Sequence, residues 1–188
     1  QTGFLINTRQ QRLFYRSWPS HDPHAFLLIV HGVGEHSGRY DEFASFLADA
    51  HLSVFSFDLP GHGQSAGKRG HIDRFDDFCD DVMTVGDHIR TIEPTRPLFL
   101  LGHSLGALIA IRAARKNGSL FRGIILSGPP LKLNFKVGTW LKRASLIAGH
   151  LLPLFSFKEK RIRLAMLSHD EKKINAFRTD PYRHYHRS

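Results

Sequence analysis

The stretch LFLLGHSLGALIAIRAARK, residues 98–116, decides the fold of this chain. Its first part is a short apolar run that follows Pro97 and ends at Gly102, a pattern that predicts a buried strand. From Ser104 onward, apolar residues recur at helical spacing, which predicts a helix over residues 104–116. Strand and helix meet at the motif Gly-His-Ser-Leu-Gly, and a serine on so sharp a turn is held above the end of its strand.

Strands and helices alternate along the chain on both sides of this stretch. The same patterns predict two short strands within 4–18 around a polar turn at 8–11, strands at 25–30, 52–58 and 121–128, and helices at 40–50 and 73–92. This alternation predicts βαβ units, and therefore an α/β protein with a mainly parallel sheet and helices on both faces. In such sheets ligands bind at the C-terminal ends of the strands, where the motifs described below fall.

Two of these segments lead to finer expectations. AFLLIV, residues 25–30, is apolar throughout, as expected of a strand that is buried on both faces. In the helix at 40–50, the side chains of Phe43, Phe46 and Leu47 share one side.

Ser104 is the candidate nucleophile. A serine hydroxyl attacks well only when it is exposed, oriented and next to a base. The strand–turn–helix context supplies exposure and orientation, while Gly102 and Gly106 let the helix and the neighbouring strand pack closely. The alternative is that Ser104 merely caps the N-terminus of the helix.

A second motif, His31-Gly32-Val33-Gly34, follows the strand at 25–30. Acyl transfer passes through a tetrahedral oxyanion that needs preorganised N–H donors. With a nucleophile on a strand-to-helix turn, the donors are the amide after the nucleophile, here Leu105, and an amide of the earlier loop, here Val33. The alternative is a plain glycine turn without a catalytic role.

Four segments together resemble the monoacylglycerol lipase and lysophospholipase branch of the α/β-hydrolases: HGVGEHSGRY (31–40), DLPGHGQSAG (58–67), GHSLGA (102–107) and LAMLSHDEKKINAFRTDPY (164–182). The resemblance covers nearly the whole chain and implies a serine carboxyl-ester hydrolase without cofactor or metal. Its substrates would be monoacylglycerols or lysophospholipid-type lipids, hydrolysed through an acyl-enzyme on Ser104. It also implies an oxyanion hole formed by Val33 and Leu105.

The same resemblance implies that Glu35, Arg39 and His103 lie near the polar end of the substrate. A plainer alternative is that Glu35 and Arg39 form an ion pair that fixes the loop, and that His103 packs under the turn. Two departures from the family pattern are Ala107, where a second glycine is common, and Phe177, where some monoacylglycerol lipases have a tyrosine. Other functions that remain open are a serine peptidase, a thioesterase of the same fold and a non-catalytic membrane-binding homologue.

The alternation of strands and helices stops at residue 131, which predicts a hydrolase core at 1–130, an inserted helical cap at 131–181 and the start of a return to the core at 182–188. The acid and the histidine of the triad are expected beyond residue 188, together with the final strands, so the 188 residues alone are expected to be nearly inactive. Asp170 or Asp180 with His184 or His186 has the right order for a triad, but these residues match the cap, and no strand precedes either aspartate. Ligand spacing also argues against a metal at these histidines.

The charge of +9 is concentrated in the second part of the chain. Residues 1–130 hold 13 Lys and Arg against 13 Asp and Glu, whereas residues 131–188 hold 13 against 4. An amphipathic helix or helix pair is expected at 137–157, with Trp140, Ala144, Ile147 and Leu151 on one face. A basic cap of this kind predicts peripheral membrane contact, or else its apolar face roofs an acyl pocket.

Other signals are weaker or negative. No nucleic-acid-binding motif accompanies the positive charge, so nucleic acid is not an expected partner. Cys79 is the single cysteine, which excludes an internal disulfide, and we expect it to be a packing residue. Neither a signal peptide nor an apolar run long enough to cross a bilayer is visible, so the expected location is cytoplasmic or peripheral to a membrane.

Overall fold

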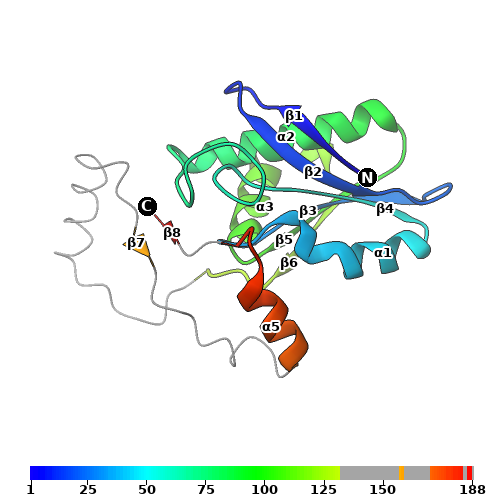
Figure 1. Ribbon diagram of the computed structural model, residues 1–188. Coiled ribbons are helices and arrows are strands. Elements are labelled where there is room, and N and C mark those ends of the chain that lie inside the picture. Colours follow the sequence, from blue (N-terminus) through cyan, green and yellow to red (C-terminus); the bar gives the residue numbers. More distant parts are fainter. Residues whose placement is uncertain (132–156, 159–169, 184–185, 188) are drawn as a thin grey trace.

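The computed structural model describes residues 1–131, 157–158, 170–183 and 186–187 (Figure 1). Six strands form one sheet in the order β1-β2-β4-β3-β5-β6. They are β1 (Thr2–Ile6), β2 (Arg12–Trp18), β3 (Ala25–Val30), β4 (Leu52–Phe57), β5 (Leu98–His103) and β6 (Gly123–Ser127). The strands β4, β3, β5 and β6 run parallel, while β1 and β2 are antiparallel to their neighbours. The predicted α/β class with a mainly parallel sheet is confirmed.

Helices cover both faces of this sheet. On one face α2 (Phe75–Ile92) lies beside α3 (Leu105–Lys116), and α1 (Asp41–Asp49) lies on the other (Figure 1). Two short 3₁₀ helices, η1 (Ser37–Tyr40) and η2 (Gly118–Leu120), precede α1 and follow α3. The helices therefore cover both faces of the parallel strands. In sheets of this kind, ligands bind at the C-terminal ends of the strands.

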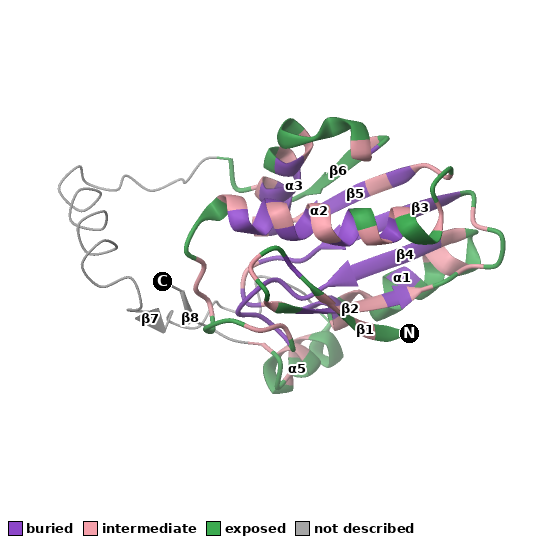
Figure 2. Ribbon diagram, turned by 90° about the horizontal axis from the view of Figure 1, so that it is seen from above, coloured by how far each residue is buried: buried purple, intermediate pink, exposed green. Residues whose placement is uncertain are grey.

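The strand β3 is buried on both faces, as its uninterrupted apolar sequence predicts. Phe26, Leu28 and Val30 pack in the core under α2 and α3. Leu27 and Ile29 pack on the opposite side with Ala44 of α1 and Val54 of β4. The buried strands at the centre of the sheet are visible in Figure 2. Because β3 is fixed on both sides, the loop that follows it begins from a rigid position.

The helix α1 packs on the sheet through Ala44 and Leu47 and leaves its two phenylalanines exposed. Ala44 is its buried residue and Leu47 is half-buried, whereas Phe43 and Phe46 are 43% and 68% exposed. Ala44 packs in one cluster with Ile29 and Val54, and its small side chain allows the helix to lie close to the sheet. The apolar pattern predicted the helix correctly, and the structure adds which of its residues contact the sheet.

Cys79 is buried in the core, as predicted from the sequence. The thiol lies on α2 and is fully buried in the larger core, which confirms its packing role. Burial raises the pKa of Cys79 to about 11, so it is an unreactive thiol at neutral pH. The helix begins at Phe75, two residues later than expected, and the Asp77 carboxylate accepts a hydrogen bond from Arg74 N–H at 3.2 Å at its start.

The last strand of the sheet, β6, is exposed on its apolar residues. Ile124, Ile125 and Leu126 are 41%, 49% and 37% exposed, although each pairs through its backbone with β5. In Figure 2 this strand is the exposed edge beside the buried centre of the sheet.

Beyond residue 131 the described residues form α5 (Glu171–Thr179) and a small sheet of β7 (Phe157–Lys158) and β8 (His186–Arg187). The helix near 170–177 is confirmed, and Asp170 begins it by accepting hydrogen bonds from Lys172 N–H and Lys173 N–H. Most of the amphipathic segment 137–157, with Trp140, Ala144, Ile147 and Leu151, lies outside the described residues, as do His184 and its environment. Among the described residues, no helix has the length and apolarity needed to cross a membrane.

Candidate active site

Ser104 lies at the turn between β5 and α3, in a backbone conformation that is rare for a side-chain-bearing residue. Its φ is 52° and its ψ is −114°. Such a conformation costs about 1–3 kcal/mol and persists only where the surrounding structure enforces it. Ser104 occupies the N-cap position of α3, but its hydroxyl accepts no capping hydrogen bond from the helix. The structure therefore contradicts the simple capping role and leaves the half-buried hydroxyl available for chemistry.

Two glycines allow this turn to pack against the sheet. A Cβ on Gly102 would lie 2.2 Å from the carbonyl oxygen of Gly106, and a Cβ on Gly106 would lie 2.1 Å from the carbonyl oxygen of Val30. Both distances are well inside van der Waals contact, so only glycine fits at either position. The close approach that the motif predicts is confirmed at both glycines.

The loop after β3 lies directly against the serine. A Cβ on Gly32 would lie 3.3 Å from Ser104 Cβ and 3.3 Å from His103 Cδ2. The loop turns at Gly34, whose φ of +72° and the hydrogen bond from Glu35 N–H to Gly32 O at 3.3 Å define a type II turn. The two sequence motifs, 31–34 and 102–106, thus meet at one edge of the sheet.

Val33 and Leu105 carry the two amides that the sequence assigned to an oxyanion hole. Over the described residues, neither N–H has a hydrogen-bond acceptor. Leu105 is the first residue of α3, where the helix leaves its N–H groups unpaired. Unpaired amides on the loop after β3 and at the start of α3 could stabilise a developing negative oxygen at Ser104, and the assignment stays a prediction.

Glu35 and Arg39 form the ion pair that was the plainer of the two expectations. Arg39 Nε lies 3.2 Å from Glu35 Oε1, and Gly32 N–H donates to Glu35 Oε2 at 3.1 Å. Burial, reinforced by the Glu35 carboxylate, raises the pKa of Tyr40 well above its ordinary value, so this phenol stays protonated and cannot act as a base. The bonds of Glu35 to Arg39 and to Gly32 N–H hold this loop next to Ser104. Any contact of the Glu35–Arg39 pair with substrate stays a prediction.

His103 is held by the neighbouring strand. Its Nδ1 lies 3.1 Å from Ser127 Oγ, and the two residues are register partners in the β5–β6 pair. Ser104 N–H donates to the Ser127 carbonyl oxygen at 2.8 Å. Ser127 was not singled out in the sequence, although its place at the C-terminal end of a parallel strand is the signal that points to it.

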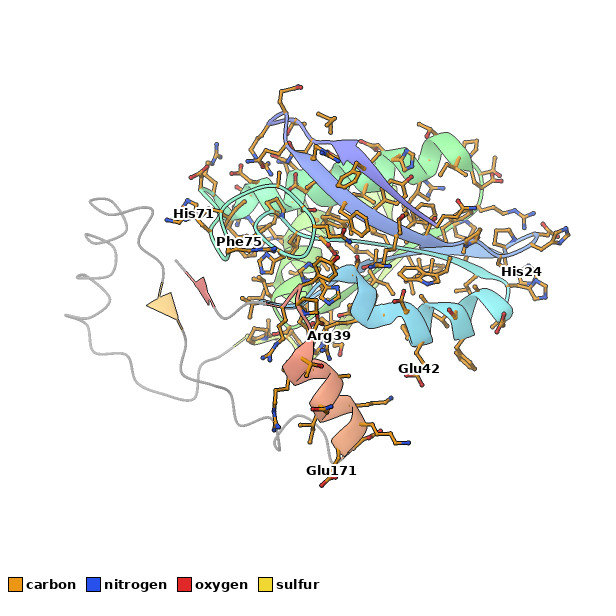
Figure 3. All side chains as sticks on the ribbon, viewed as in Figure 1. His24, Arg39, Glu42, His71, Phe75 and Glu171 are labelled. Atoms are coloured by element: carbon orange, nitrogen blue, oxygen red, sulfur yellow. The ribbon has the colours of Figure 1, made fainter. Side chains whose placement is uncertain are left out.

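The segment 170–183 packs onto the loop that carries Glu35 and Arg39. Two guanidinium groups contact the Phe177 ring, with Arg39 Cζ 4.2 Å and Arg183 Cζ 3.4 Å from its centroid. Figure 3 shows Arg39 beside the end of α5 that faces the sheet, while Glu171 marks the opposite end. Phe177 thus contacts Arg39 of the loop at 31–40, although the two residues are more than 130 positions apart in the sequence.

His36 and Asp180 connect the same two parts of the chain. Gly38 N–H donates to His36 Nδ1 at 3.2 Å, so the ring proton is on Nε2, which donates to Asp180 Oδ2 at 2.7 Å. The buried Asp58 carboxylate accepts from Ser37 N–H and Gln64 N–H, each at 2.7 Å. Two carboxylates, Asp58 and Asp180, therefore hold the loop at Ser37 and at His36. Neither role was predicted from the sequence.

Known hydrolases resemble this chain in sequence. Residues 21–188 match the family model described as serine aminopeptidase, S33. The chain is 37% identical over 179 residues to monoglyceride lipase of Mus musculus, covering 94% of this chain and 58% of the mouse protein. It is 34% identical over 165 residues to phospholipase YtpA of Bacillus subtilis, covering 87% of this chain and 62% of that protein.

The fold also has a close counterpart among solved structures. The crystal structure of monoacylglycerol lipase from Paleococcus ferrophilus matches with a TM-score of 0.80 at 29% sequence identity, covering 94% of this chain and 65% of that one. This chain therefore spans less than two thirds of the length of each of these three relatives.

Proposed function

Because the chain belongs to the serine aminopeptidase family of the α/β-hydrolases, we propose that the whole protein is a serine carboxyl-ester hydrolase. The observation that supports this most strongly is the strained turn at Ser104, whose backbone φ of 52° is found next to the Gly32 loop. Strained backbone conformations cluster at functional sites, and a strained serine between a strand and a helix is typical of a catalytic nucleophile. The acyl-enzyme would form on Ser104.

Each part of the proposed site has a role in this reaction. Ser104 Oγ adds to the acyl carbonyl carbon while its proton passes to a base, and the carbonyl oxygen becomes an oxyanion. The amides of Val33 and Leu105 stabilise that charge, and one such donor is worth about 10²–10³ in kcat. On collapse of the intermediate the base returns its proton to the leaving alcohol, and the acyl group stays on Ser104. Water, whose proton passes to the same base, then releases the carboxylic acid and restores the serine hydroxyl.

The base and its orienting acid follow the nucleophile in chain order in this fold. His103 precedes the nucleophile instead of following it, and the hydrogen bond that its ring makes is to Ser127 Oγ. Over the described residues, the Ser104 hydroxyl has no hydrogen-bond partner. We therefore propose that the catalytic histidine and acid belong to the whole protein outside residues 1–188, as the sequence resemblance implies.

Single-chain lipid esters are the proposed substrates, either monoacylglycerols or lysophospholipid-type lipids. The names of the relatives support this class: one is a monoglyceride lipase and another is a phospholipase. Glu35, Arg39 and His103 line the loop and turn beside Ser104, where they would meet the polar end of the substrate. The excess of positive charge in residues 131–188 supports peripheral contact with an anionic membrane, from which such lipids are collected, and hence a cytoplasmic or membrane-peripheral location.

A second candidate is a serine peptidase, which the description of the matching family names directly. A peptidase needs the same nucleophile and oxyanion donors, so the geometry at Ser104 does not separate the two reactions. Substrate profiling of the whole protein does, with a thioesterase as a third arm. We expect monoacylglycerol hydrolysis to exceed that of aminoacyl amides and acyl-CoA thioesters by at least about 100-fold in kcat/KM, a difference of about 2.7 kcal/mol in transition-state stabilisation.

The control for this profile is Ser104→Ala, which removes the nucleophile at a half-buried position without adding bulk. We expect the variant to lose ester hydrolysis and retain the thermal unfolding temperature of the wild type. A preference of the wild type for amides or thioesters would replace the lipid esterase with the corresponding alternative. Liposome binding without hydrolysis of any ester, amide or thioester would indicate the non-catalytic homologue.

A further inference from the structure

His31 is a fully buried histidine that connects the ends of two strands. Its Nε2 accepts a hydrogen bond from Leu59 N–H at 3.0 Å, just beyond the end of β4. A ring nitrogen that accepts carries no proton, so in the neutral ring the proton is on Nδ1. Nδ1 lies 2.7 Å from the carbonyl oxygen of Gly32, to which it donates. The contact with Leu59 therefore sets the tautomer that His31 uses to hold Gly32.

Gly32 is held at both of its backbone polar groups. Its carbonyl oxygen accepts from His31 Nδ1–H and, at the longer distance of 3.3 Å, from Glu35 N–H. Its own N–H donates to Glu35 Oε2 at 3.1 Å. The contact from His31 is the shortest of these, and together with the Glu35 N–H it sets the direction in which the Gly32 carbonyl points.

That direction determines where the next amide points. The peptide bond between Gly32 and Val33 is planar and trans, since the described chain has no cis peptide bond. In a trans peptide the C=O and the N–H point in opposite directions. When His31 draws the Gly32 carbonyl to its own side, the Val33 N–H is turned to the other side. Gly32 itself lies against Ser104, and Val33 N–H has no acceptor among the described residues.

We propose that His31 is a positioning residue, which orients the Gly32–Val33 peptide so that Val33 N–H faces the oxyanion formed at Ser104. The inference rests on the proposed function and deepens it, because it names the group that preorganises one of the two donors. His31 touches neither the substrate nor the reacting atoms. It acts through Gly32, and its effect is expected on the transition state rather than on substrate binding.

Two substitutions separate the two hydrogen bonds of this ring. In His31→Asn the side-chain amide can place Nδ2 where the imidazole has Nδ1, so the donation to Gly32 O is retained and the contact with Leu59 is lost. In His31→Gln the longer side chain can place Oε1 where the imidazole has Nε2. The acceptor for Leu59 N–H is then retained, and the donation to Gly32 O is lost. A purely structural role predicts similar effects, since each variant loses one buried hydrogen bond.

The test uses the whole protein, a short-chain p-nitrophenyl ester and active sites counted with a fluorophosphonate. We expect His31→Gln to lower kcat by about 100-fold with KM within about threefold of the wild type, as for the loss of one oxyanion donor. His31→Asn should retain kcat within about tenfold, although both variants have similar unfolding temperatures. Equal kcat losses in the two variants, or losses confined to KM, would overturn the positioning role while leaving the esterase intact.

A measurement on the wild type covers the case in which either variant does not fold. Nitrogen-15 NMR of the histidine rings reports which nitrogen of His31 carries the proton. We expect the proton on Nδ1, and a proton on Nε2 would overturn the inference because the donation to Gly32 O would then be absent. A wild type that hydrolyses no ester would overturn the proposed esterase function itself. Failure of the proposed function is thereby distinguished from failure of the His31 positioning role.

Discussion

Gly32 and Ser104 belong to loops 72 positions apart in the sequence, yet a Cβ on Gly32 would lie 3.3 Å from Cβ of Ser104. This approach brings the loop after β3 over the turn after β5, since the two strands are parallel neighbours in the sheet. It is the relationship that the motifs at 31–34 and 102–106 imply and that separate glycine turns would not require. The predictions below follow from this contact and from the groups that maintain it.

Gly32→Ala should impair catalysis more than stability. The new methyl would lie 3.1 Å from Glu35 Oε2 and 3.3 Å from Ser104 Cβ, so the loop or the nucleophile must shift by a few tenths of an ångström. We expect about a tenfold loss of kcat, because small misplacements at a reacting group are costly. The measurement is ester hydrolysis by the whole protein together with its thermal unfolding. Gly118→Ala is the matched control, since a Cβ there meets nothing within 4 Å and kcat should be unchanged.

Gly106→Ala should instead reduce the free energy of unfolding. Its Cβ would lie 2.1 Å from the carbonyl oxygen of Val30, and a backbone atom on a fully buried strand cannot move aside cheaply. Overpacking of this kind costs about 1–3 kcal/mol or more. Urea unfolding of the variant and of Gly118→Ala measures the difference. A Gly106→Ala protein as stable as the control would show that the turn is not packed as described.

Asp81 should make stability depend on pH in an unusual direction for a carboxylate. Burial raises the pKa of Asp81 to about 6, against the opposing effect of Arg9, whose Nη2 lies 2.7 Å from Oδ2, and of the amide of Asn7. The nearby Asp77 carboxylate raises it further. The folded protein therefore holds this proton more tightly than the unfolded chain, so the contribution of Asp81 is largest below about pH 4 and falls as the pH rises to about 6.

The comparison that isolates this effect is Asp81→Asn, measured by urea unfolding between pH 4.5 and 7.5. The wild type should lose free energy of unfolding relative to the variant as the pH rises, by up to about 1.4 kcal/mol for each unit of pH within that window. A relative gain by the wild type with rising pH would mean that the ion pair with Arg9 outweighs burial, and that the pKa of Asp81 is lowered.

Asp180→Ala should weaken the attachment of α5 to the loop at 31–40. The substitution removes the acceptor for His36 Nε2–H and for Tyr182 N–H. A partly buried hydrogen bond to a charged group contributes about 1.5–3 kcal/mol, so amide exchange in 171–179 and around Ser37 should become faster. Arg178→Ala is the control on the same helix, since Arg178 is exposed, and it should leave exchange near Ser37 unchanged. Equal exchange near Ser37 in the two variants would mean that Asp180 does not couple the segments.

The parts of the site that the sequence predicted are those that depend on local rules. Gly102, Ser104 and Gly106 lie within five residues, and the steric reason for each glycine follows from the strand–turn–helix motif alone. The ion pair of Glu35 with Arg39 is likewise a local pairing at a separation of four residues. Patterns of this length specify backbone geometry directly, so the prediction and the structure agree.

The parts that were missed depend on how distant segments meet. The contact of His36 with Asp180 spans 144 residues, and no periodicity connects the two. Ser127 reaches His103 only through the register of β5 with β6. The sequence likewise did not show that Ala44 is the α1 residue that packs with Ile29 and Val54, while Phe43 and Phe46 are exposed. Tertiary packing sets these features, and a single sequence carries no record of it.

The central claim is that Ser104 is an activated nucleophile, and active-site labelling tests it most directly. The whole protein is treated with a fluorophosphonate, digested and mapped by mass spectrometry, with Ser104→Ala treated in parallel. The account predicts one phosphonylated residue, Ser104, in the wild type and none in the variant. Labelling that persists in Ser104→Ala, or a wild type that remains unlabelled while folded, would contradict it.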